Sequence, residues 1–146
     1  MNKHEIRTIL ENKDIDRVKE FVTDVARKLA PIYEQEHGKK DLSFCMVIVA
    51  CEADPCKRAA AIYLDKLRKD LLDPPKAVQE HIFVLDSMIS ATYACIVENE
   101  DEIINHSITS LERAIAASAA SREINNRVNM CIQRWKSNWR GYIGSQ

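Results

Sequence analysis

Glycine and proline are scarce in this chain of 146 residues, which holds three glycines and four prolines. Both residues interrupt regular secondary structure, and here they are concentrated near a few breaks. Apolar residues make up 46% of the chain and charged residues 29%. That is the composition of a globular protein, so it excludes a chain that is disordered throughout. Together the two observations favour helices.

Long apolar runs are also missing. The longest one, FCMVIVAC at residues 44–51, is far shorter than the roughly twenty residues that a bilayer requires. The charged first residues do not resemble a secretory signal, and the five cysteines are an odd number. We therefore expect reduced thiols, a cytoplasmic location and no membrane contact. The net charge of −1 is too balanced to indicate nucleic acid or a membrane as a partner of the whole surface.

The familiar motifs of catalysis are absent as well. The chain contains no Gly-rich phosphate loop, no nucleophile elbow and no Cys-x-x-Cys pair. Zinc sites usually contain such closely spaced pairs, so Cys45, Cys51 and Cys56 are expected to be free cysteines in the core. The sequence predicts neither a metal site nor a cofactor, and it contains no motif that indicates an enzyme.

Apolar residues that recur every three or four positions predict amphipathic helices along most of the chain. The first helical region is residues 4–37, interrupted at 12–14, and Pro31 is expected to end or kink it. Two further helices follow Asp-Pro start signals, one ending at Leu72 and one spanning about 75–98. After a turn at ENEDE come two more helices, and Gly141 is expected to fray the last.

The ambiguous residues 42–52 are interpreted as a short buried helix, because a lone strand has no pairing partner. The predicted fold is all-α, a single domain over residues 1–146 built as a bundle of five to seven helices.

The helix over 75–98 is expected to lie in the middle of the bundle, since its apolar residues occupy more than one face. Asp86 interrupts the apolar sequence HIFVLDSMI and must find hydrogen-bond donors. We favour a structural role in which a serine, an arginine or an amide satisfies this carboxylate. The alternative is a buried functional acid with His81 in the same network, which would make the protein an enzyme.

Two charged segments are candidates for binding. Acids dominate the turn near residue 100, and they either complement the start of a helix or attract a basic partner. The last helix is basic, with Arg127, Arg134, Lys136 and Arg140. Trp135 continues an apolar stripe and is expected in the core. For Trp139 and Arg140, near the chain end, an exposed anchor for a protein partner is as well supported as a place in the core. The predicted partner-binding residues are Glu98, Glu100, Asp101, Glu102, Trp139 and Arg140.

The expected function is therefore that of a non-enzymatic helical binding protein. It would act by protein-protein contact, in the manner of an inhibitor or immunity protein that covers a basic partner such as a nuclease. The first alternative is a nucleic-acid-associated module that uses the basic last helix. It is less favoured, because the basic residues are scattered around that helix and do not line one face. The sequence does not predict the oligomeric state.

Overall fold

The computed structural model describes residues 3–11, 14–37, 58–72 and 79–144. These residues form six helices and no strand, which confirms the predicted all-α bundle. The helices are α1 (Lys3–Glu11), α2 (Ile15–His37), α4 (Arg58–Leu72), α5 (Gln79–Ile96), α6 (Glu100–Ala120) and α7 (Arg122–Gly144). The helix expected over residues 42–52 and the two Asp-Pro start signals lie outside the described residues.

Polar side chains cap the starts of three helices, where the first backbone N–H groups have no partner within the helix. The carboxylate of Asp14 accepts from the amide two residues further on at 2.9 Å. Asn99 and Ser121 each accept from the amide three residues further on, at 3.1 Å and 3.4 Å. These caps determine where α2, α6 and α7 begin.

Two expected helix breakers do not end their helices. α2 continues past Pro31 to His37, and α7 continues past Gly141 to Gly144. Proline costs about 3 kcal/mol inside a helix and glycine about 1 kcal/mol, and packing can outweigh either cost. On both sides of Pro31 the chain is held in the core, by Leu29 and Tyr33. Pro31 therefore does not end α2, and the alternative that Pro31 kinks the helix stays a prediction. The backbone of α7 stays helical past Gly141, where we expected fraying.

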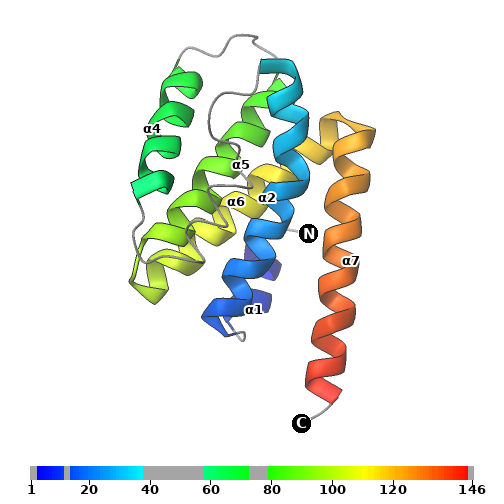
Figure 1. Cartoon of the computed structure of the whole chain (residues 1–146). Helices are drawn as coiled ribbons and strands as arrows, with labels where there is room; N and C mark the ends of the chain where they lie inside the picture. The colour runs from blue at the N-terminus through cyan, green and yellow to red at the C-terminus, as the bar shows by residue number, and fades with distance from the viewer. Residues whose placement is uncertain (1–2, 12–13, 38–57, 73–78, 145–146) are drawn as a thin grey trace.

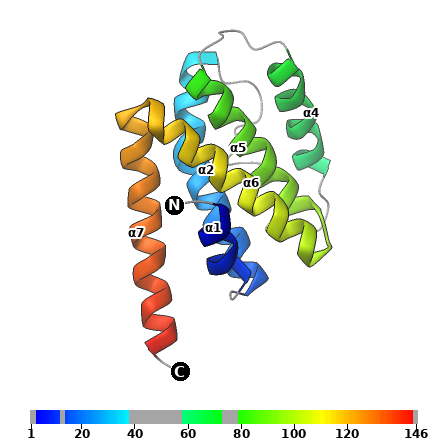
Figure 2. The ribbon, with the colours of Figure 1, turned by 180° about the vertical axis from the view of Figure 1, so that it is seen from behind.

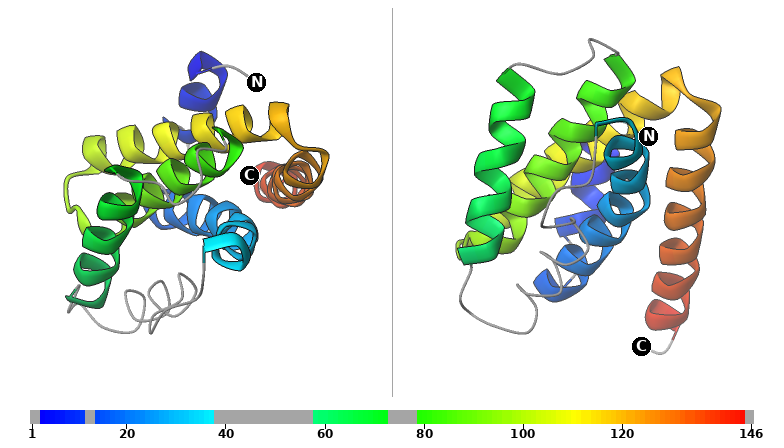
Figure 3. Two further views of the ribbon diagram at one scale, coloured as in Figure 1. Left: turned by 90° about the horizontal axis from the view of Figure 1, so that it is seen from above. Right: turned by 45° about the horizontal axis from the view of Figure 1, so that its top comes forward.

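The central element is α5, as its many-sided apolar pattern predicts. It packs against α2, α4 and α6, and it forms an antiparallel pair with α6 (Figure 1). Seen from behind, α1 lies against α6 (Figure 2). The views from above and from an oblique angle show α4 and α7 on opposite sides of this centre (Figure 3). Surfaces on α4 and on α7 therefore face different directions.

A single cluster of buried apolar side chains receives residues from all six described helices. Small residues let α5 and α6 approach closely within it, and Ala91 of α5 and Ala114 and Ala117 of α6 are fully buried there. Two serines satisfy each other across this seam. Ser87 donates to the carbonyl of Ser110 at 2.7 Å, and Ser110 donates to the carbonyl of Ser87 at 2.8 Å. Because both hydroxyls are bonded, the buried polar pair does not carry the cost of unmet hydrogen bonds.

Candidate functional site

Four acidic residues gather at the turn between α5 and α6. The turn itself is only Val97–Asn99, so the predicted turn over ENEDE was too long, and three of the acids lie in the first turn of α6. All four side chains are exposed, and within the described part of the chain none forms a salt bridge. The group, hereafter the acidic tip, consists of Glu98, Glu100, Asp101 and Glu102.

The acidic tip stands on a firmly bonded turn. The amide of Val97 donates to the carbonyl of Tyr93 at 3.0 Å, and the amide of Ile103 donates to the carbonyl of Asn99 at 3.0 Å. Ile103 and Ile104, directly behind the acids, are buried in the core. The carboxylates are thus presented at a defined place, and the partial positive charge of the helix start stabilises them there.

The second candidate surface is where α7 docks on α2. Arg134 and Trp135 of α7 both donate to the same oxygen of Asp24 on α2, Trp135 through Nε1 at 3.0 Å. The indole of Trp135 also packs on the ring of Phe21, with the ring centroids 5.5 Å apart. Trp135 is 7% exposed, so the expectation that it belongs to the core is confirmed.

The predicted anchors Trp139 and Arg140 belong to the last turns of α7, whose backbone is helical. The red end of α7 extends beyond α1 and the first turns of α2 in both the front and the rear view (Figures 1 and 2). The side chains of residues 136–144 lie outside the description, so the contacts expected for Trp139 and Arg140 stay predictions.

Half of the basic residues predicted to contact nucleic acid are engaged inside the fold. Arg134 pairs with Asp24. Arg127 pairs with Glu123 at 3.0 Å and also donates to the carbonyl of Lys28 at 2.9 Å. Cations that are already paired have less to gain from a phosphate, so this arrangement weighs against the nucleic-acid alternative.

Asp86 is not a buried acid. Its side chain is 30% exposed, and its carboxylate is 2.7 Å from Nε of Arg113 on α6. His81 is also only half-buried, and a separation of five residues turns it about 140° around α5 from Asp86. Asp86 thus meets an arginine as its donor, one of the partners that we expected for it. The alternative of a functional Asp86 with His81 stays a prediction.

The histidine on α6 takes part in an aromatic stack. His106 lies on the ring of Tyr93 with the centroids 5.0 Å apart, and the guanidinium of Arg68 is 4.9 Å from the centre of the same ring. This stack ties α4 to α5 and α6. Periodicity could not reveal it, because the three residues lie far apart in the sequence.

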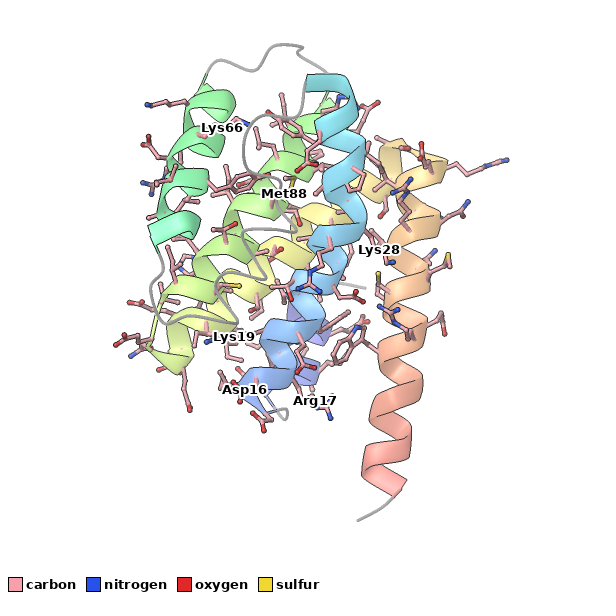
Figure 4. The ribbon with its side chains drawn as sticks, in the orientation of Figure 1. Asp16, Arg17, Lys19, Lys28, Lys66 and Met88 are labelled. Carbon is pink, nitrogen blue, oxygen red and sulfur yellow. The ribbon has the colours of Figure 1, made fainter. Side chains whose placement is uncertain are left out.

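An open hollow of about 790 Å³ runs along the exposed side of α2 and reaches the Asp24 pair. Asp16, Arg17 and Lys19 line its lower part at the first turns of α2 (Figure 4). Four basic and three acidic residues line the hollow, so its net charge is small.

Cysteine chemistry is not evident at the described thiols. Burial, followed by the nearby charge of Asp24, raises the pKa of Cys131 to about 11, so this thiol is uncharged at neutral pH. Among the described residues no cluster of histidines, cysteines and carboxylates could hold a metal ion. Cys45, Cys51 and Cys56 lie outside the described residues.

Compared with known proteins, the chain matches no family model, no curated protein and no solved structure. No helix in the described ranges combines the length and the apolar character needed to span a membrane.

The Asp24 pair makes stability depend on pH. Burial alone would raise the pKa of Asp24, but the hydrogen bonds from Arg134 and Trp135 outweigh it and hold the pKa below its usual value. The folded state therefore binds the proton less tightly than the unfolded chain. The stabilisation is complete above the unfolded pKa of about 3.9 and is lost as the pH falls through the lower folded value.

We expect the free energy of unfolding of the wild type to exceed that of Asp24→Asn at pH 6–7, and the difference to shrink below a pH of about 4. Urea unfolding of both proteins from pH 3 to pH 7 measures this difference in the free energy of unfolding. The asparagine keeps a carbonyl oxygen as acceptor but cannot titrate, so other carboxylates cancel in the comparison. A difference that stays constant over this range would contradict the assigned role of Asp24.

Proposed function

We propose that this protein is a non-enzymatic binding protein that acts by protein-protein contact and covers a basic partner, as an inhibitor or immunity protein covers a nuclease. The observation that carries the proposal is the acidic tip, four exposed carboxylates that no described cation neutralises. Such a group attracts positive charge at long range and orients an approaching partner before contact.

The way the turn is held supports this function. The tip lies on a short turn with a capped helix start and buried isoleucines behind it, so little ordering is needed when a partner binds. Preorganised groups bind with a smaller entropic cost than mobile ones. The extended end of α7, with Trp139 and Arg140, offers a second place for a partner to contact (Figure 1).

Reversing the charge of the tip tests the proposal. Glu100→Lys with Glu102→Lys should slow association with the partner on the order of tenfold at low salt and weaken its salt dependence, with a smaller change in dissociation. The folded state should lose only about 0.3 to 1 kcal/mol per acid from the start of α6. Association rates at low and moderate salt, together with thermal unfolding, measure both effects.

The control is Glu11→Lys with Glu20→Lys, which changes the net charge equally on α1 and α2. Basic proteins captured from an extract of the source cells at physiological salt should be lost with the tip variant and retained with the control. Rates are then measured with the purified captured protein. If thermal stability falls while capture and association are unchanged, the tip is only a helix start and the proposed function is overturned.

A further inference from the structure

An open groove with a mostly apolar lining lies between α2 and α7. Its volume is about 840 Å³. Lys28 lies at its α2 edge, facing α7 (Figure 4). The remaining described residues around it all come from α7. They are Asn126, Arg127, Asn129, Met130, Cys131, Gln133 and Arg134.

Two properties of the groove define what fits it. Three cations and three amide side chains border it, and no described acidic residue does. Met130 is 74% exposed there, more than any other large apolar side chain that the structure describes. An occupant that carries carboxylates would neutralise the border.

The cations keep a positive surplus even after their internal pairing. Arg127 and Arg134 are each balanced by one carboxylate, Glu123 and Asp24. Lys28 forms no salt bridge with a described residue, although its charge contributes to the low pKa of Asp24. The described border therefore keeps one net positive charge, three cations against two paired carboxylates.

The acidic tip is the matching surface, and it is carried by every copy of the chain. It lies at the α5–α6 turn, on the far side of the bundle from α7 in the view from above (Figure 3). A molecule therefore cannot place its own tip in its own groove. The net charge is only −1, so two copies repel each other little as they approach.

We propose that the groove between α2 and α7 receives the acidic tip of a second copy of this chain. The contact is head-to-tail, since each copy contributes its tip to one neighbour and its groove to another. Contacts of this kind build rings or open chains rather than symmetric dimers. The inference shares the acidic tip with the proposed function but needs no foreign partner. Self-association would cover the tip until a basic partner displaces the neighbouring copy.

Sedimentation velocity of the purified chain tests the contact. The wild type should form assemblies larger than a monomer at about 0.01 M salt, where charges act over roughly 30 Å, and return to monomers at about 1 M salt. The tip variant Glu100→Gln with Glu102→Gln and the groove variant Met130→Glu should each weaken association on the order of tenfold at low salt. All three side chains are exposed, so circular dichroism should stay unchanged.

Mixing the two variants gives the decisive result. The tip variant keeps an intact groove and the groove variant keeps an intact tip, so together they should form a one-to-one complex and nothing larger. Glu11→Gln with Glu20→Gln, the control with the same charge change, should associate like the wild type. A wild type that stays monomeric at low salt, or a mixture that forms no complex, would overturn this inference. Neither result affects the capture of a basic partner at physiological salt. The experiments can therefore overturn self-association without overturning the proposed binding function, and the reverse.

Discussion

Leu85→Ala should lower the free energy of unfolding by about 2 to 5 kcal/mol. Leu85 is 1% exposed and sits on the helix that contacts α2, α4 and α6. Removing three carbon atoms there leaves a cavity that no single neighbouring helix can close. Ile89→Ala, on the same helix and 5% exposed, should fall in the same range.

Urea unfolding followed by circular dichroism measures the loss. The matched control is Ile62→Ala on α4, which truncates a side chain of the same kind that is 56% exposed. It should change stability by no more than about 0.5 kcal/mol. A loss below about 1 kcal/mol for Leu85→Ala would mean that α5 is peripheral, and the described bundle would then be incorrect.

Trp135→Ala should cost about 3 to 5 kcal/mol, because it removes the largest side chain between α7 and α2. The variant loses the contact with Phe21 and leaves the Asp24 carboxylate with one donor fewer. Within the described chain the main packing partners of α7 are α2 and α6. The damage should therefore concentrate in α7.

Hydrogen exchange distinguishes this local loss from a general one. Amides of α7 should lose more protection than those of α5 in Trp135→Ala, since a flank can open while the centre stays closed. Trp135→Phe keeps an aromatic ring against Phe21 but removes the Nε1 donor, and should cost only about 1 kcal/mol. Equal loss of protection in α5 and α7 would show that α7 does not open separately.

Much of the fold followed from spacing alone. The apolar periodicity predicted the all-α bundle and the interruption between α1 and α2, and the Asp-Pro signal after Leu72 placed the end of α4 there. It also predicted that α5 would be central, because its apolar residues cover several faces. These features are local or nearly so, and a helix repeats every 3.6 residues whatever its neighbours are.

The ends of the helices were harder to predict from the sequence. The local effect of a cap or a helix breaker competes with the packing of the surrounding residues. Asn99 caps α6 one residue before Glu100, so part of ENEDE became helix. Pro31 carries a fixed local cost, but buried neighbours on both sides hold α2 together. The strength of that packing is not a property of the residues near the proline. That strength depends on which other helices pack against α2 at this point.

What the sequence determined by itself is therefore the helices, the apolar faces they bury and the concentration of acid near residue 100. Only the tertiary structure decided which charges on different helices are paired. Asp86 meets Arg113, and Asp24 meets Arg134 across 110 positions of the chain, so neither partner could be found by periodicity. The acidic tip meets no described cation. Helical spacing fixes which residues share a face, but the energy of a charge depends on what the packed neighbours bring within a few ångströms of it.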